Sequence, residues 1–179
     1  DKPSQKVCLG ERYEVVLRPT AQSQAFRPES MPLHVVYEDA HLRVIHKPAG
    51  LVCHPTKGDE FSSLVSRVRL HLGPATEPQM VHRLDRETSG VMVFGKTASA
   101  AVELRRLWEG GFVSKEYVAI AHGQPDMDSG EIDAPLGPDT SSAVAIKDCV
   151  RPDGAAARTR WWCVRRFRQA EGAFSLLRV

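Results

Sequence analysis

The chain has no long hydrophobic run, no close pair of cysteines and no cluster of metal-binding side chains. Its apolar stretches fall well short of the roughly 18 residues that a membrane-spanning helix needs, and the first residues show no secretory signal pattern. The four cysteines stand far apart, which argues against a zinc site or a disulfide scaffold and fits a reducing compartment. We therefore expect a cytoplasmic protein without a membrane partner.

The sequence also has no recognisable metal-binding motif and no strong net charge. His41, His46 and His54 lie near one another in the sequence but lack the spacing of a metal-binding motif, so we expect no metal. The net charge of +2 is only mildly basic, which permits a polyanionic partner without requiring one. The charge distribution says more than the total.

Five arginines fall between residues 158 and 168, interleaved with aromatic side chains. They are Arg158, Arg160, Arg165, Arg166 and Arg168, and the aromatic residues are Trp161, Trp162 and Phe167. Basic residues mixed with aromatic ones suit phosphate contact and base stacking, as in RNA-binding proteins. The same pattern also fits a solvated strand face beside a core face. The residues of this cluster alone leave both interpretations open.

The chain is long enough for one globular domain with a core and a fragment of a second. Residues 7–17 predict a turn at Gly10 and Glu11 followed by a strand. Residues 18–32 contain three prolines and no periodicity, which indicates a linker. We therefore expect a domain boundary near residue 32.

From Leu33 onward the pattern predicts alternating strands and helices. Strands are expected at 35–37, 42–47, 91–94, 115–122, 157–166 and 173–179. Apolar spacing predicts one helix from about Phe61 to Gly73, and a second helix from an N-cap at Thr97 or Ser99 to Gly110. Residues 124–143 are expected to form a long irregular loop. This order favours an α+β fold with a mixed, largely antiparallel sheet and flanking helices.

The stretch VHRLDRETSGVMVF, residues 81–94, places Asp85 between Arg83 and Arg86, next to His82. Neighbouring positive charge favours the ionised form of a carboxylate, which suits a nucleophile or a fixed negative charge better than a general acid. The small residues that follow suit an exposed loop held by a strand. The alternative is a structural carboxylate that is merely paired with arginine.

Residues 82–90, HRLDRETSG, closely resemble the H-R-L-D-x-x-T-S-G signature of the RluA-type pseudouridine synthases. Two other blocks agree in order. Residues 47–55 resemble the K-P-x-G-x-x-x-H-P segment, preceded by a Y-E-D-x-x-L pattern at 37–42, and residues 115–117 match K-x-Y. The resemblance covers roughly residues 33–179. Residues 1–32 resemble the tail of an S4-type RNA-binding domain and a linker.

The resemblance implies an enzyme that isomerises uridine to pseudouridine in structured ribosomal or transfer RNA, without a metal or cofactor. It implies that Asp85 is the catalytic carboxylate, as a nucleophile at C1′ or as a base at C2′. Tyr117 would pack against the flipped uracil, although an alternating strand also predicts a core aromatic there. Arg83 would fill the space that the flipped nucleotide leaves.

The resemblance also implies a set of RNA-contacting residues around this loop. Arg86 occupies a variable position of the motif, so it either contacts phosphate or has no role. We expect His82 to brace the loop by hydrogen bonding rather than to transfer a proton. The full expected RNA-binding set is Arg83, His82, Arg86, Lys115, Thr88 and Ser89. We expect the protein to be a monomer.

Two departures qualify the resemblance. His46 stands where the family usually has Asn or Asp, and no G-R-T-H-Q-I-R-like segment, which would carry a basic partner for Asp85, occurs in the chain. We therefore expect this polypeptide alone to be weakly active or inactive, and a parent protein longer by on the order of 60 to 100 residues. One alternative is a catalytically inactive RNA-binding module. Another is a glycosidic-bond hydrolase, for which Glu87 is a poor second carboxylate.

Overall fold

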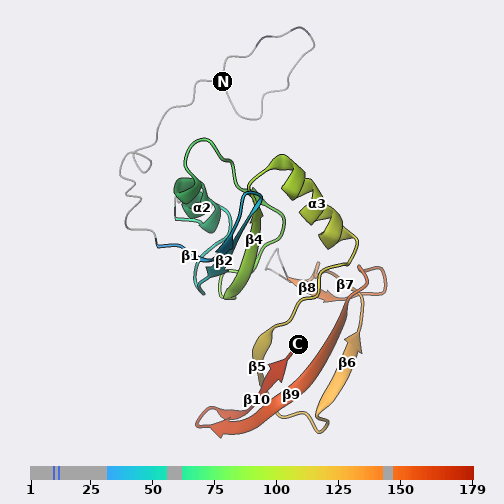
Figure 1. The fold of residues 1–179 in the computed structure, drawn as a ribbon. Coiled ribbons are helices and arrows are strands. Elements are labelled where there is room, and N and C mark those ends of the chain that lie inside the picture. Colours follow the sequence, from blue (N-terminus) through green and yellow to red (C-terminus); the bar gives the residue numbers. More distant parts are fainter. Residues whose placement is uncertain (1–9, 11, 13–31, 56–61, 143–146) are drawn as a thin grey trace. The chain divides into compact units, whose positions relative to one another are not determined.

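The computed structural model describes residues 10, 12, 32–55, 62–142 and 147–179 (Figure 1). These residues group into two compact units that divide between Val113 and Ser114. The strand expected at 7–17, the linker and the expected S4-like tail lie almost entirely outside the described residues, so the domain boundary near residue 32 stays a prediction.

The first unit contains a four-stranded antiparallel sheet with the strand order β1-β2-β4-β3. Its strands are β1 (His34–Glu38), β2 (Leu42–Lys47), β3 (Gln79–Met80) and β4 (Gly90–Gly95). Alternate residues of β2 are buried, as expected for a strand with one face on a core. Ile45 of β2 packs with Met92 and Phe94 of β4 in the buried cluster.

Two helices complete the described part of the first unit. Both ends of the second helix and the end of the first agree with the sequence prediction, whereas the first begins at Leu64, three residues later than expected. Helix α2 (Leu64–Leu72) contributes Leu64, Val65 and Val68 to the core and ends at Gly73, which has a positive φ of 76°. Helix α3 (Ala98–Glu109) begins at Thr97, whose hydroxyl accepts a hydrogen bond from the N–H of Ala100 at 3.2 Å.

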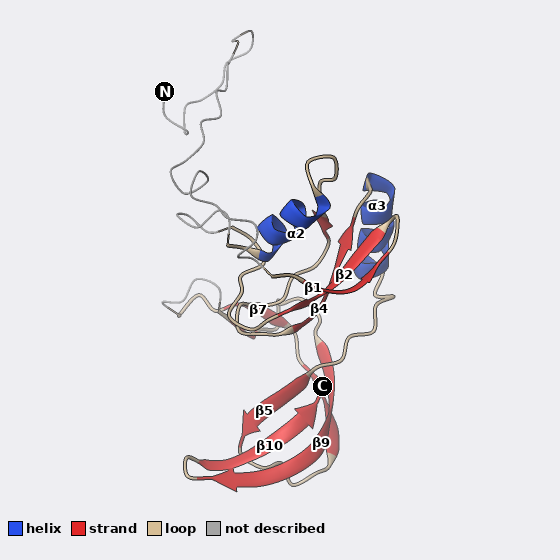
Figure 2. Cartoon of the chain, turned by 60° about the vertical axis from the view of Figure 1, so that its left-hand side comes forward, coloured by secondary structure: helices blue, strands red, loops and turns tan. Residues whose placement is uncertain are grey.

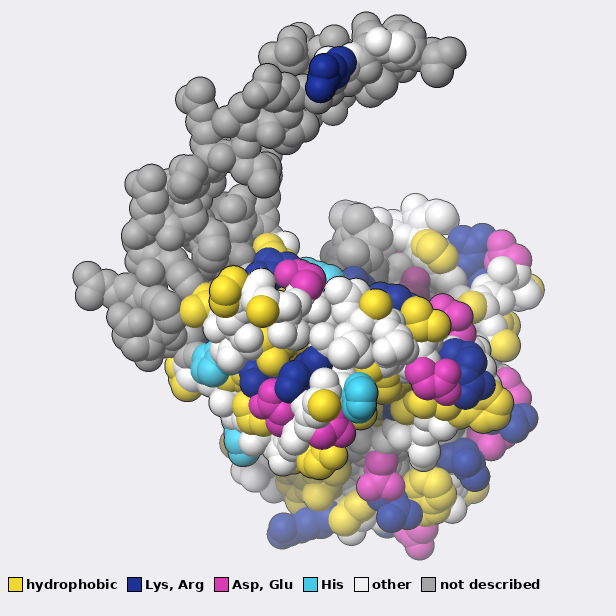
Figure 3. All heavy atoms as spheres, turned by 45° about the horizontal axis from the view of Figure 1, so that its top comes forward, with side chains coloured by type: hydrophobic (Ala, Val, Ile, Leu, Met, Phe, Trp, Pro, Cys, Tyr) yellow, Lys and Arg dark blue, Asp and Glu magenta, His cyan; other side chains and the backbone are white. Residues whose placement is uncertain are grey.

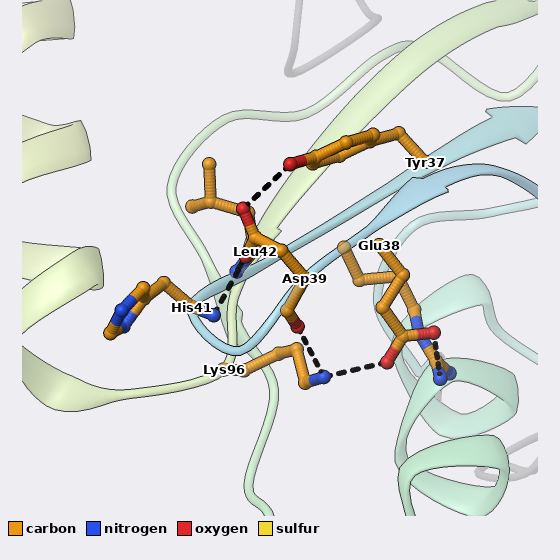
Figure 4. A network of polar contacts seen from close by, with 7 residues as sticks. Tyr37, Glu38, Asp39, His41, Leu42 and Lys96 are labelled. Atoms are coloured by element: carbon orange, nitrogen blue, oxygen red, sulfur yellow. Dashed lines mark hydrogen bonds and ion pairs between the residues drawn. The ribbon is translucent and has the colours of Figure 1, made fainter.

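Hydrogen bonds fix the tight turn between β1 and β2 and tie it to the end of β4 (Figure 4). One carboxylate oxygen of Asp39 accepts from the backbone N–H groups of His41 and Leu42, both at 2.7 Å. These bonds lower the pKa of Asp39 because they favour its ionised form. Lys96, the residue after β4, donates to Glu38 at 2.7 Å and to the Asp39 carbonyl at 2.6 Å. These two bonds connect the end of β4 to the turn between β1 and β2.

The second unit is built from strands (Figure 2). An antiparallel sheet has the order β5-β10-β9-β6, and a separate pair is formed by two short strands. The large sheet consists of β5 (Val118–His122), β6 (Ser129–Asp133), β9 (Arg158–Gln169) and β10 (Gly172–Arg178). The short pair is β7 (Leu136–Pro138) with β8 (Asp148–Val150).

The expectation of an irregular loop at residues 124–143 is wrong, because β6 and β7 lie within it. Strand β6 is mostly polar and exposed, so its sequence carries no alternation. It is a strand because it pairs with β9 in an antiparallel ladder of backbone hydrogen bonds, from Ser129 opposite Trp162 to Asp133 opposite Arg158. The other strands and helices expected within the described residues are present, although β5 begins at Val118 and not at Lys115, and the α+β class with its largely antiparallel sheets is confirmed. The short strands β3 and β8 were not predicted.

Candidate functional site

Asp85 lies on the loop between β3 and β4 of the first unit, and its side chain is exposed. The backbone N–H of Thr88 donates to the Asp85 carbonyl at 3.2 Å, which closes a turn directly after the carboxylate. Thr88 is half-buried and Ser89 is exposed. Gly90, with a φ of 144°, then begins β4, so the loop leads straight into a central strand of the sheet.

The backbone on both sides of Asp85 is held by a segment far away in sequence. The Cys53 thiol donates to the Leu84 carbonyl at 3.1 Å, and the N–H of Gly50 donates to the Arg86 carbonyl at 2.8 Å. Cys53 is part of the buried core cluster. The loop therefore presents an exposed carboxylate on a main chain that is anchored to the core.

Lys47 also holds the backbone of the Asp85 loop in place through its side chain. Its side chain is fully buried, and its ammonium group donates to three backbone carbonyls: Pro48 at 3.0 Å, Leu51 at 2.8 Å and Arg86 at 3.0 Å. Three acceptors match the three N–H donors of an ammonium group. Burial lowers the pKa of Lys47, because the charged form loses its hydration. The site thus uses a buried lysine as a hydrogen-bond donor to the loop backbone.

The flanking arginines do not pair with the carboxylate in the described part of the chain. Arg86 donates from Nε to the Gly50 carbonyl at 3.2 Å and lies 3.5 Å from Glu87. Neither Arg83 nor Arg86 forms an ion pair with Asp85 among the described residues. The structure therefore does not support the interpretation of Asp85 as a structural carboxylate that is merely paired with arginine.

His82 joins the start of this loop to the rest of the first unit. Its Nε2 accepts a hydrogen bond from the backbone N–H of Val93 in β4 at 3.0 Å. Its ring stacks on Trp108 of α3, with ring centroids 4.5 Å apart and planes 18° from parallel. The role of Trp108 has no signal in the sequence, because an aromatic residue near a helix end looks like an ordinary packing residue.

Lys115 and Tyr117 belong to the second unit, just before β5. The Tyr117 N–H donates to the Val179 carbonyl at 2.7 Å, and the Val179 N–H donates to the Tyr117 carbonyl at 2.9 Å. A mutually bonded antiparallel pair places both side chains on the same face of a sheet. The Tyr117 side chain is 41% exposed, so it is not the core aromatic that alternation alone predicts. Lys115 is also exposed.

The face that Val179 shares with Tyr117 carries a hollow of about 520 Å³. Trp161 and Leu177 contribute to its mostly apolar lining. The hydroxyl of Ser175 lies in this lining, is buried, and has no hydrogen-bond partner among the described residues. The second unit therefore has an accessible apolar face beside its predicted site tyrosine.

The structure thus brings six of the predicted site residues together on one loop of the first unit. These are His82, Arg83, Asp85, Arg86, Thr88 and Ser89. In Figure 3, cationic and anionic side chains are interspersed over the surface in view and form no extended area of one sign. Within the described ranges, no three His, Cys, Asp or Glu residues are arranged to hold a metal ion. Neither α2 nor α3, the helices of those ranges, is long and apolar enough to cross a membrane.

Comparison with known proteins assigns this arrangement to a family. The family model described as RNA pseudouridylate synthase matches residues 41–179. An uncharacterized RNA pseudouridine synthase of Aquifex aeolicus (strain VF5) is 35% identical over 185 residues, which cover 99% of this chain and 57% of that protein. The ribosomal large subunit pseudouridine synthase D of Neisseria meningitidis serogroup B is 41% identical over 145 residues, which cover 78% and 38%.

A solved structure agrees with this assignment at the level of the fold. Human RNA Pseudouridylate Synthase Domain Containing 1 superposes with a TM-score of 0.68 at 18% identity, covering 90% of this chain and 61% of that one. The chain spans about half the length of the curated relatives that it matches. The matched region includes the Asp85 loop, the Lys47 anchor and Tyr117, and the chain belongs to the RNA pseudouridylate synthase family.

Proposed function

We propose that the protein carrying this chain isomerises uridine to pseudouridine in RNA, with Asp85 as the catalytic carboxylate. The observation that carries this proposal is an exposed carboxylate, not paired with its flanking arginines among the described residues, on a loop whose backbone is anchored by Lys47, Gly50 and Cys53. Such an arrangement leaves the carboxylate free to reach a sugar while its position is held, which is the geometric requirement for a positioned catalytic group.

The reaction rearranges one nucleotide without a net gain or loss of atoms. The bond between uracil N1 and ribose C1′ breaks, the base turns, and a new bond joins C5 to C1′. The hydrogen on C5 leaves as a proton, and N1 gains one. Asp85 acts either by attacking C1′ or by removing the proton from C2′, and an ionised carboxylate serves both routes.

The target base has to leave its stack before C1′ becomes accessible, which costs a few kcal/mol. Arg83 is exposed beside Asp85, and its planar guanidinium suits stacking in the vacated space. The Arg86 side chain is 68% exposed, so it remains accessible to a phosphate despite its bond to Gly50. We also propose that Tyr117 packs against the flipped uracil and that Lys115 contacts the RNA.

Large-subunit ribosomal RNA is the substrate class that we propose. Relatives at 33–41% identity carry the name ribosomal large subunit pseudouridine synthase D. Transfer RNA, the other class expected from the sequence, becomes an alternative outcome of the test below. The cytoplasmic location, the monomeric state and the longer parent protein stay predictions.

The test compares Asp85→Asn with Glu87→Gln in the full-length protein. Both variants neutralise an exposed carboxylate of the same loop without changing its size. Tritium release from RNA labelled at uridine C5 measures turnover, and pseudouridine profiling of ribosomal and transfer RNA identifies the substrate. We expect Asp85→Asn to abolish tritium release and Glu87→Gln to retain it.

The outcomes separate the alternatives. RNA binding by the unmodified protein without any tritium release would identify an inactive RNA-binding module. Equal loss in both variants, with free uracil as the product, would favour a hydrolase that uses two carboxylates. Full turnover by Asp85→Asn would refute the proposed role of Asp85.

A further inference from the structure

His82 occupies the place where the ladder between β3 and β4 stops. Strand β3 pairs with β4 only through Gln79 with Gly95 and Met80 with Phe94. Val93 is the next residue along β4, and its N–H is met by the His82 imidazole instead of a strand carbonyl. The side chain therefore continues the edge of the sheet just as the backbone departs into the loop that carries Asp85.

This hydrogen bond determines the form of the imidazole ring. A nitrogen that accepts from a backbone N–H carries a lone pair and no proton, so the proton of the neutral ring is on Nδ1. The Nε2 lone pair is already used by Val93 and is not available to take a proton from a substrate. His82 thus contributes through the position of its ring, three residues before the carboxylate.

Trp108 of α3 constrains the plane of that ring. An imidazole can turn about its side-chain bonds, and its hydrogen bond to Val93 does not by itself fix its plane. Trp108 adds a constraint on the plane, because its ring lies nearly parallel to His82 at a centroid distance of 4.5 Å. Trp108 is in the last turn of α3, which packs on β4, so the stack connects the helix with the loop.

We infer that Trp108 is a positioning residue for the reaction, acting through the His82 ring to hold the start of the Asp85 loop against β4. The inference rests on the proposed function of Asp85. Trp108 stands 23 positions after Asp85 in the sequence and belongs to no motif of the loop. Removal of the stack should let the His82 ring turn, weaken its bond to Val93 and loosen the loop without removing any group that contacts RNA.

The test uses two substitutions of Trp108 and one of its partner in the full-length protein. Trp108→Leu removes the stacking surface, Trp108→Phe retains an aromatic face, and His82→Gln retains an acceptor near the Nε2 position. Val102→Ala, at an exposed position of the same helix, is the control. The measurements are the ¹⁵N shifts of the His82 ring, amide exchange at Val93, and kcat and KM from tritium release.

We expect unmodified protein to show an unprotonated His82 Nε2 and slow exchange at Val93. Trp108→Leu should speed that exchange and lower kcat by roughly 3- to 10-fold, the range that one lost aromatic stack supports, with KM changed less than about 2-fold. Trp108→Phe should recover most of kcat, His82→Gln should lower kcat about as much as Trp108→Leu because it removes the ring that stacks, and Val102→Ala should match the unmodified protein.

Two results would overturn the inference in different ways. Unchanged kcat and unchanged Val93 exchange in Trp108→Leu would show that the stack does not position the His82 ring. Faster Val93 exchange with unaltered kcat would reduce Trp108 to a purely structural role. An unmodified protein without turnover would refute the proposed function itself, while the Val93 exchange and the ¹⁵N shifts would still report whether the contact between Trp108 and His82 exists.

Discussion

Replacement of Lys47 by Met tests whether the hydrogen bonds of the Lys47 ammonium group hold the backbone of the Asp85 loop. Methionine has a side chain of similar length and apolar character, so it fills the buried site but supplies neither the charge nor the N–H donors. Lys47 has no exposed surface, and its three acceptors include the carbonyl of Arg86, the residue after Asp85. The substitution therefore removes a connection between β2 and the loop while the core volume is kept.

Two opposing effects determine the size of the loss. The carbonyls of Pro48 and Leu51 lose the donor that Lys47 supplies, whereas the Arg86 carbonyl keeps the N–H of Gly50. The Leu51 carbonyl, the acceptor of the buried bond, then costs about 1–3 kcal/mol, whereas Pro48 is an exposed residue whose carbonyl water can reach. Against this, the lowered pKa of Lys47 shows that burial of its charge is unfavourable, and methionine relieves that cost. We expect a net loss of about 1–2 kcal/mol in the free energy of unfolding.

Chemical denaturation at pH 7 measures this loss, and amide exchange at Gly50 and Thr88 shows whether the loop opens locally. Lys96→Met is the matched control, because Lys96 also bonds a backbone carbonyl but lies at the opposite end of β4. We expect Gly50 and Thr88 to exchange faster only in Lys47→Met. A Lys47→Met protein with the stability and exchange rates of the unmodified protein would refute the anchor.

Substitutions at three further positions test other parts of the structure. Hydrogen bonds from Lys96 and Arg43 lower the pKa of Glu38, so Glu38 stabilises the fold above its ordinary pKa of about 4.5, and this contribution is lost as the pH falls through the folded value. Glu38→Gln should lower the thermal midpoint at pH 7 and have little effect near pH 3, as followed by circular dichroism. Gly95→Ala places a Cβ 3.0 Å from the backbone of Ala101, so denaturation should show a loss of about 1–3 kcal/mol. Tyr117→Phe should retain RNA binding and lower tritium release less than Tyr117→Leu, if the ring itself packs on the uracil.

Much of the first unit follows from local chemistry. Thr97 caps α3 because its hydroxyl meets a free N–H, and Gly73 ends α2 because it adopts a positive φ without a steric penalty. The alternation along β2 reflects one face on the core. Each of these signals acts within a few residues, so the elements could be predicted without knowledge of their partners.

The error at residues 124–143 has the opposite cause. Strand β6 owes its conformation to a ladder with β9, about thirty residues later, and to ion pairs that Arg158 makes with Glu131 and Asp133. A polar edge strand has no hydrophobic period of its own. Residues rich in Pro, Gly, Asp and Ser therefore look irregular until the neighbouring strand is placed.

The sequence by itself determined most of the element types, the family and the loop on which the catalytic residue is proposed, because these depend on residue types at short spacing. Only the tertiary structure showed that Lys47 and Cys53 hold the backbone around Asp85, that Arg86 donates to the Gly50 carbonyl, and that Trp108 stacks on His82. Hydrogen bonds to backbone carbonyls carry no sequence signature, since every residue has a carbonyl. Which side chain reaches which carbonyl is decided by the packing of distant segments.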